Sequence, residues 1–249
     1  YIPSCIPTAL PDAPAQGGSF TLASVGSAVS DVCEEIKKKL FSFAVETDNN
    51  FKDAKYEEVI FKDESLSLKN NPSVTISYTQ LLRNKNVTEI DITKSSASGE
   101  ESKKYSFNSY AVHFAEVHVH AYTGVVRVKR FVSCVDAGKI VSEKTAAGQI
   151  KGAVVWGIGQ ALMEEQQIDH RYGRIMANDF AGYHIPVNAD VPEIDVTFIN
   201  KPDPYINPMG SKGLGEVGLI GSAAAIANAV FNATGKRIRQ LPITPDKLI

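Results

Sequence analysis

The chain has 249 residues, of which 43% are hydrophobic and 22% are charged, and its formal net charge is −2. This length can bury a hydrophobic core in one large domain or two smaller ones, and the composition is ordinary for a globular protein. A nearly neutral chain offers no basic surface for phosphate groups, so we expect no nucleic-acid partner. We also expect no membrane span, because no apolar run is judged long enough to cross a bilayer.

Cysteine is rare and scattered. Cys5, Cys33 and Cys134 form no C-x-x-C pair, so the sequence contains no zinc or iron–sulfur motif and no disulfide framework. We therefore expect buried free thiols in a reducing compartment, which favours a cytoplasmic location. The chain begins at Tyr1, so its first residues do not identify the compartment, and a periplasmic location stays open.

Proline dominates the beginning of the chain. Residues 1–18 contain four prolines and end in Gly17-Gly18, which predicts an extended arm because proline has a fixed φ and no amide hydrogen. The turn that follows carries hydroxyl groups on Ser19 and Thr21. These groups could bind a polar ligand or belong to a plain linker and helix cap, and the residues alone favour the linker.

Helical periodicity follows this turn. Apolar residues spaced from Val25 to Leu40 predict a helix with Ser24 or Ser27 as its N-cap. The stretch 45–105 is polar, and we interpret it as scaffold and surface. Within it, KYEEVIFKDESLSLK predicts a hairpin of short strands, and SYTQLLRN predicts a short helix beginning near Ser77 or Thr79.

The clearest strand pattern lies between residues 108 and 136. Apolar and polar residues alternate in YAVHFAEVHVHAY and again in VVRVKRFVSCVD, and Thr123-Gly124 between them predicts a hairpin turn. Glu116, His118 and His120 share one strand face and have possible metal-ligand spacing. Because no further ligand is evident nearby, solvated histidines are the favoured interpretation.

A long helix is predicted for residues 142–166. Its four glycines weaken an isolated helix, which makes sense where the backbone packs tightly against another element or a large ligand. Gln149 and Gln160 are polar residues on this otherwise apolar length. Each is interpreted either as a buried amide directed at a ligand or as a satisfied core amide, and the spacing does not decide between them.

The most unusual stretch is GSKGLGEVGLIGSAAAIANAVF, residues 210–231, which follows a strand predicted at 193–200. Four glycines surround one acid, Glu216, and a buried helix is predicted after them. Glu216 could carry out chemistry, or it could be a helix-start acid that interacts with the helix dipole. The string GLGEVG fits the dinucleotide fingerprint G-x-G-x-x-G, but no apolar strand precedes it and no acid follows about 20 residues later, so a dinucleotide site is rejected.

Four segments of the chain, in the same order, resemble the C-terminal part of the molybdenum-binding subunit of the xanthine dehydrogenase/aldehyde oxidase family. They cover well over half of the chain, and the last is the most specific because loop, acid, helix and the RQLPITPDKL tail match as one unit. The stretch 45–105 matches only loosely. The four segments are AQGGSFTLASVGSAV (15–29), FAEVHVHAYTGVVRVKRFVSCVDAGKIV (114–141), AAGQIKGAVVWGIGQALMEE (146–165) and GSKGLGEVGLIGSAAAIANAVFNATGKRIRQLPITPDKL (210–248).

The resemblance implies an α+β fold with long helices packed on small mixed sheets, in which residues 1–249 form the second molybdopterin-binding region. It implies a molybdenum hydroxylase that oxidises a nitrogen heterocycle, xanthine-, purine- or nicotinate-like, or an aldehyde, with water as the oxygen source. Glu216 falls on the family's catalytic glutamate, which takes a proton from a molybdenum-bound hydroxyl. A carboxylate is a sufficient base there, because the metal makes the oxygen acidic.

The cofactor positions also follow from the resemblance. It places cofactor contacts at Gly17, Gly18, Ser19, Thr21, Gln149, Lys212, Gly213 and Gly215. In this family the cofactor's sulfurs hold the molybdenum, so no protein side chain is expected to be a metal ligand. The molybdopterin could carry a cytosine dinucleotide.

The segments that the sequence lacks imply partners. Iron–sulfur clusters and FAD are expected on partner chains, and the upstream half of the molybdenum subunit is expected to enclose the cofactor with this chain. The chain alone is therefore expected to be inactive. The alternative is a non-catalytic assembly subunit or an isolated fragment of such an enzyme, and retention of Glu216 among its glycines favours the catalytic interpretation.

Overall fold

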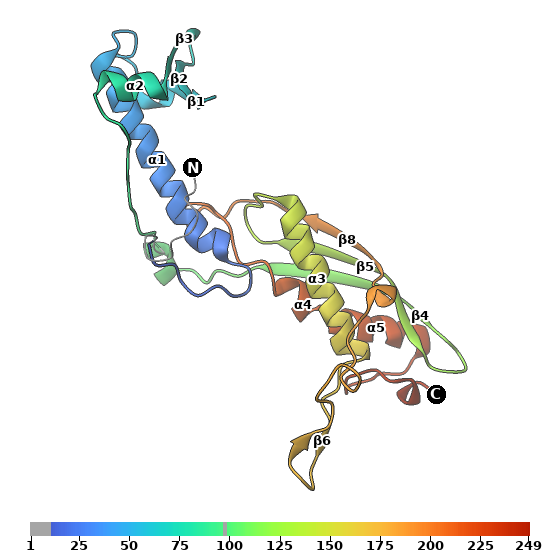
Figure 1. Cartoon of the computed structure of the whole chain (residues 1–249). Coiled ribbons are helices and arrows are strands. Elements are labelled where there is room, and N and C mark those ends of the chain that lie inside the picture. Colours follow the sequence, from blue (N-terminus) through green and yellow to red (C-terminus); the bar gives the residue numbers. More distant parts are fainter. Residues whose placement is uncertain (1–10, 97–98) are drawn as a thin grey trace. The chain divides into compact units, whose positions relative to one another are not determined.

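The computed structural model describes residues 11–96 and 99–249 (Figure 1). The chain divides into two compact units. The small unit comprises Tyr1–Pro14 and Ser24–Ala97, and the large unit comprises Ala15–Ala23 and Ser98–Ile249. Cys5 and the first part of the predicted arm lie outside the described residues.

The small unit combines a long helix with a three-stranded antiparallel sheet of strand order β1-β2-β3. The predicted hairpin and short helix are confirmed, and the Ser77 side chain accepts a hydrogen bond from the Gln80 amide as the N-cap of the short helix. The elements are α1 (Thr21–Thr47), a 3-10 turn (Tyr56–Glu58), β1 (Val59–Lys62), β2 (Ser65–Leu68), β3 (Asn71–Ser77) and α2 (Tyr78–Asn84). Its core consists of Leu40, Phe43, Ala44, Phe51, Val59, Leu66, Ile76 and Leu81.

Two predictions for this region are wrong. Helix α1 begins at Thr21, directly after the turn at Gly18 and Ser19, so Ser24 and Ser27 lie inside the helix and neither is its N-cap. Cys33 is exposed and not buried. Helical periodicity identified the helix, but the turn at Gly18 and Ser19 decides where the helix starts.

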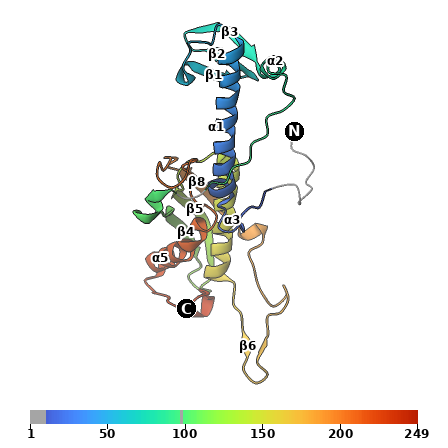
Figure 2. The same ribbon diagram turned by 90° about the vertical axis from the view of Figure 1, so that its left-hand side faces the viewer.

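The large unit contains a mixed sheet of strand order β4-β5-β8, in which β4 pairs with β5 antiparallel and β8 pairs with β5 parallel. The predicted hairpin and the predicted last strand are therefore confirmed. The elements before the last helices are a 3-10 turn (Glu100–Lys103), β4 (Tyr110–Val119), β5 (Val126–Asp136), α3 (Glu143–Leu162), β6 (Ile168–Asp169), β7 (Arg174–Ile175), a 3-10 turn (Asn188–Asp190) and β8 (Glu193–Phe198). The loop that carries β6 and β7 extends beyond the C-terminal end of α3 (Figure 1 and Figure 2).

Two helices at the C-terminus replace the single buried helix predicted there. Helix α4 (Val217–Ile220) ends at Gly221, and α5 (Ser222–Thr234) then runs to Gly235, whose φ of 69° confirms the predicted left-handed C-cap. A 3-10 turn (Pro245–Lys247) follows. Helix α3 is also shorter than predicted, since Met163 leaves the helical conformation with a φ of −135°.

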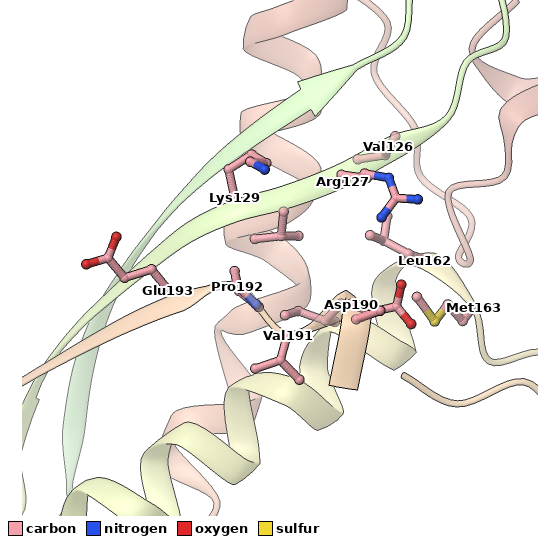
Figure 3. A pocket seen from close by; sticks show the side chains of 12 residues that line it. Val126, Arg127, Lys129, Leu162, Met163, Asp190, Val191, Pro192 and Glu193 are labelled. Carbon is pink, nitrogen blue, oxygen red and sulfur yellow. The ribbon is translucent and has the colours of Figure 1, made fainter. Parts of the chain in front are cut away.

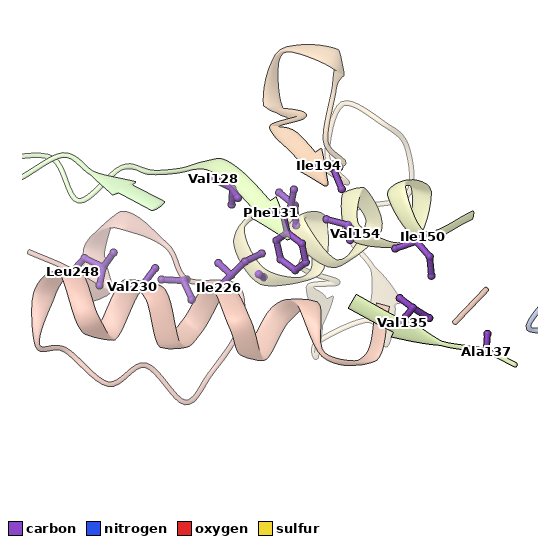
Figure 4. Packing of buried hydrophobic residues seen from close by; sticks show 13 residues of the cluster. Val128, Phe131, Val135, Ala137, Ile150, Val154, Ile194, Ile226, Val230 and Leu248 are labelled. Atoms are coloured by element: carbon purple, nitrogen blue, oxygen red, sulfur yellow. The ribbon is translucent and has the colours of Figure 1, made fainter. Parts of the chain in front are cut away.

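The core of the large unit lies between one face of the sheet and the helices α3 and α5 (Figure 4). Phe131 of β5, Ile150 and Val154 of α3, and Ile226 of α5 are fully buried. The other buried members are Val128, Val135, Ala137, Ile158, Ala161, Ile194, Val230, Ile243 and Leu248. Residues from β5 to the C-terminal 3-10 turn thus form one core, against which Leu214 and Val217 of the loop before α4 and its first turn also pack. This confirms the α+β fold with helices on a small mixed sheet.

One described stretch, Val217–Thr234, is long and apolar enough to cross a membrane by length and composition alone. The prediction that no run reaches this length is therefore wrong. The stretch is weak support for a span, because core helices pass the same test. Within it, Ile226 and Val230 are fully buried in the core of the large unit, whereas 22% of the stretch as a whole is buried.

Candidate functional site

The N-terminal turn of the large unit packs against the glycine-rich loop before α4. The Gly18 carbonyl accepts hydrogen bonds from the amides of Leu214, at 3.2 Å, and Gly215, at 2.9 Å. The turn is tight, since φ is +56° at Gly18 and +55° at Ser19. A side chain on Gly215 would collide with the Ser19 hydroxyl, so glycine permits this close contact.

Gln149 of α3 joins the same turn. The Ser19 hydroxyl donates a hydrogen bond to Gln149 Oε1 at 2.5 Å, across 130 positions of sequence. Both Gln149 and Gln160 are exposed, so neither is the buried amide considered from the sequence. The Ser19 hydroxyl binds the oxygen of the Gln149 amide, so the amide nitrogen takes no part in this hydrogen bond. The bond fixes the orientation of the amide.

Glu216 lies at the N-cap position of α4 and is exposed. Its side chain makes no capping hydrogen bond to a described backbone amide of this helix, which weakens its interpretation as a helix-start acid. The carboxylate lies beside the turn instead: a Cβ on Gly18 would be 3.8 Å from Glu216 Cδ. Glu216 thus lies next to the turn at Gly18 and Ser19, called the serine turn below, but it is not enclosed by the described residues.

These segments line one groove of the large unit. Its lining residues are Gly18, Ser19, Gly148, Gln149, Gly152, Ala153, Trp156, Gly215 and Glu216. Glu216 contributes the charged group of this lining, and Ser19 and Gln149 contribute a hydroxyl and an amide. Three regions distant in sequence therefore meet there: the turn, one face of α3, and the glycine-rich loop.

The four glycines of α3 fall into two pairs. A Cβ on Gly157 or Gly159 would collide with neighbouring side chains, so these two permit close packing of the helix. A Cβ on Gly148 or Gly152 would meet no described heavy atom within 4 Å, so these two leave a bare strip of helix in the groove. Tight packing, as considered from the sequence, accounts for the first pair, and open space for a bound group fits the second.

Lys212 takes a different position. Its ammonium lies 3.6 Å from a carboxylate oxygen of Asp136 and 3.6 Å from one of Asp203, and its side chain is only 11% exposed. Its backbone amide donates to the Ala137 carbonyl at 2.9 Å. Lys212 therefore anchors the loop, and it lines a neighbouring cavity that also includes Ser19 and Gln149.

The remaining predicted residues lie around the turn and loop. Thr21 begins α1, and its hydroxyl donates to Gln16 Oε1 at 2.5 Å. Gly17 opens the turn, since its carbonyl accepts from the Phe20 amide at 3.4 Å. The Gly213 carbonyl accepts from the Ser109 hydroxyl at 2.5 Å. Gly17, Thr21 and Gly213 are not among the residues that line the groove in the described chain.

Three residues near the groove were missed in the sequence. Trp156 is 59% exposed and lines the groove one turn beyond Gly152. It is the single tryptophan of the chain, which was an available signal. Ser109, the residue before β4, contacts the glycine-rich loop, and His113 of β4 contacts α4. No local pattern in the sequence indicates these contacts.

Another cavity of the large unit lies between β5, the start of β8 and the end of α3 (Figure 3). Arg127 and Lys129 line it together with Asp190 and Glu193, so both signs of charge are present. None of the site residues predicted from the sequence is among its described lining residues. We therefore assign the candidate site to the groove at Glu216.

The described residues contain no group of three or more His, Cys, Asp or Glu side chains that could hold a metal ion. His118 lies 3.8 Å from Glu116, and both side chains are well exposed, as expected for a solvated strand face. The groove instead offers a bare helix strip, a hydroxyl and an amide, which fit a polar organic cofactor better than a naked ion.

The sequence model of the molybdopterin cofactor-binding domain matches residues 7–192. The chain belongs to this family. The resemblance to the xanthine dehydrogenase/aldehyde oxidase family is thereby confirmed. Among its relatives is the aldehyde oxidoreductase molybdenum-binding subunit PaoC of Escherichia coli, which is 51% identical over 151 residues; these cover 61% of this chain and 21% of PaoC.

Solved structures agree with this assignment. Aldehyde oxidoreductase from Desulfovibrio gigas is 34% identical, with a TM-score of 0.51 over 56% of this chain and 15% of that one. CO dehydrogenase from Oligotropha carboxidovorans has the same fold, with a TM-score of 0.77 over 97% of this chain and 30% of that one at 18% identity. The chain thus spans 15% to 30% of the length of these three relatives.

Proposed function

We propose that this chain is part of a molybdenum hydroxylase, in which the groove of the large unit binds one side of the molybdopterin and Glu216 acts as the general base. One observation carries the proposal: the serine turn, Gln149 and Glu216 come from three distant segments and line one groove. An unrelated set of exposed residues would have no reason to converge in this way.

The groove supplies groups suited to a pterin. The Gln149 amide and the backbone of the turn at Gly18 and Ser19 offer donors and acceptors for ring nitrogens and exocyclic groups. Gly148 and Gly152 let a flat group approach the helix backbone. When bound, molybdopterin would supply the oxygen-transfer and two-electron chemistry.

Glu216 would then hold and move the proton. Its carboxylate accepts a proton while an oxygen derived from water is transferred to the substrate carbon, which requires hydrogen-bonding reach to the proton. Its exposure leaves room for a cofactor and substrate on the open side of the groove. The upstream part of the molybdenum subunit would cover that side, consistent with the short share of PaoC that this chain spans.

We further propose a substrate class and partners for this chain. The substrate would be a small aldehyde or nitrogen heterocycle. Relatives named aldehyde oxidoreductase and probable hypoxanthine oxidase support both classes. Iron–sulfur and flavin subunits would carry the electrons away, a cytosine dinucleotide form of the pterin would be accommodated, and the cytoplasm is the proposed compartment.

Glu216→Gln in the assembled enzyme tests the proposal. Glutamine keeps the size of the side chain but cannot accept the proton, so we expect kcat to fall by about 10²- to 10⁴-fold on aldehyde and purine substrates. Molybdenum and pterin per chain should stay at the unmodified level. Glu193→Gln, an exposed carboxylate on β8, is the matched control and should leave kcat unchanged.

The other outcomes are equally informative. Retained turnover in Glu216→Gln refutes the base assignment. Loss of molybdenum in that variant assigns Glu216 to cofactor binding instead. An assembled complex in which the unmodified chain carries no molybdenum would favour the assembly role.

A further inference from the structure

A half-buried histidine connects the sheet of the large unit to the start of α4. His113 lies on β4, and its Nε2 is 3.1 Å from the carbonyl oxygen of Val217, the residue after Glu216. Its Nδ1 is 2.9 Å from the hydroxyl of Ser133 on β5, which is fully buried. The imidazole therefore spans from the sheet to the backbone beside the proposed base.

The two partners define the tautomer. A carbonyl oxygen can only accept, so Nε2 must carry a hydrogen that it donates to Val217. The Ser133 hydroxyl can then donate to the unprotonated Nδ1, which satisfies both ring nitrogens in the neutral form. Burial lowers the pKa of His113, which also favours the neutral ring.

The short helix needs this donor. Helix α4 has four residues, and at its end the Gly221 amide donates to the Leu219 carbonyl, not to the Val217 carbonyl four residues before it. A carbonyl left without a partner in a partly buried position costs free energy, so the His113 contact stabilises the first turn. The ring also fits closely: a Cβ on Gly221 would lie 2.5 Å from His113 Cδ2.

Glu216 is thereby held on both sides. Before it, the Gly215 amide donates to the Gly18 carbonyl at 2.9 Å. After it, the Val217 carbonyl accepts from His113. Within the proposed function, on which this inference rests, we propose that His113 is a positioning residue that fixes the backbone of Glu216 so that its carboxylate meets the bound substrate and cofactor.

A nearly isosteric pair of substitutions tests this role. His113→Gln keeps an N–H group near the position of Nε2, whereas His113→Met fills a similar volume without a donor. In the assembled enzyme we expect His113→Met to lower kcat about tenfold and His113→Gln to stay within about threefold of the unmodified enzyme, since small misplacements of a catalytic group are costly. Molybdenum content should be equal in both, and His118→Met, on the exposed face of the same strand, should change nothing.

A purely structural role predicts a different pattern. Equal losses in the Gln and Met variants, or losses that follow molybdenum content, would overturn the proposal, as would unmodified kcat in His113→Met. Failure of the base assignment is recognised separately, because it appears as retained turnover in Glu216→Gln.

Two measurements on the full chain do not depend on turnover. The ¹⁵N resonances of His113 near neutral pH should show a protonated Nε2 and an unprotonated Nδ1. Amide hydrogen exchange in residues 217–220 should rise several-fold in His113→Met but not in His113→Gln. The opposite tautomer, or equal exchange in both variants, contradicts the anchoring of α4 by His113.

Discussion

The small and the large unit are both built on buried aromatic and aliphatic cores, but only one of them carries the candidate site. In the small unit, successive elements pair with their chain neighbours, as in the β1-β2-β3 sheet. In the large unit, contacts such as the Ser19–Gln149 hydrogen bond join segments 130 positions apart. Local order can arise from local pattern, whereas a site of this kind requires the whole unit to fold.

A matched pair of core substitutions tests whether the two units unfold separately. Phe131 in the large unit and Phe51 in the small unit are both fully buried, so replacement by alanine should cost about 3–5 kcal/mol of unfolding free energy in either unit. Only Phe131→Ala should increase amide exchange in the segments of the Glu216 groove. Denaturant unfolding combined with hydrogen exchange resolved by segment measures both effects.

The two units do not unfold separately if the two substitutions act alike. Increased exchange at the groove in Phe51→Ala, equal to that in Phe131→Ala, would mean that the units do not open separately. The large unit would then not be sufficient to order the site.

A smaller effect is expected at Lys212, which separates an anchoring role from a cofactor-binding role. Lys212→Met leaves Asp136 and Asp203 without their shared cation, so we expect the large unit to lose about 1–3 kcal/mol of stability. The exposed Lys139, which lines the same neighbouring cavity, provides the control Lys139→Met with the same change of charge. Unchanged stability together with reduced cofactor content would support direct cofactor binding by Lys212.

Much of the fold could be predicted from the sequence, because the spacing of apolar residues along a helix or strand indicates which of its faces is buried. Alternation in β4 and β5 and the stripe in α3 are direct consequences of one face packing on a core. The errors lie where burial does not decide the boundary. The predicted C-terminal helix is divided at Gly221, where a Cβ would collide with the His113 ring of β4. That contact comes from a strand distant in sequence.

The site could be predicted only in part. The resemblance indicated Ser19, Gln149 and Glu216, which the structure brings to one groove. It did not indicate that Lys212 faces two carboxylates, since those acids lie 76 and 9 positions away in sequence, at Asp136 and Asp203. Contacts of this kind depend on the tertiary fold and leave no local pattern.

The bare strip of α3 permits the most direct test of the cofactor groove. Gly152→Leu should stabilise the large unit slightly, by less than about 1 kcal/mol, because leucine favours a helix over glycine. The same side chain fills the groove, so molybdenum and pterin per chain in the assembled enzyme should fall strongly, whereas Lys151→Leu on the neighbouring exposed position should leave both unchanged. Full molybdenum and pterin content in a folded Gly152→Leu enzyme would contradict the claim that the cofactor lies between the serine turn, α3 and Glu216.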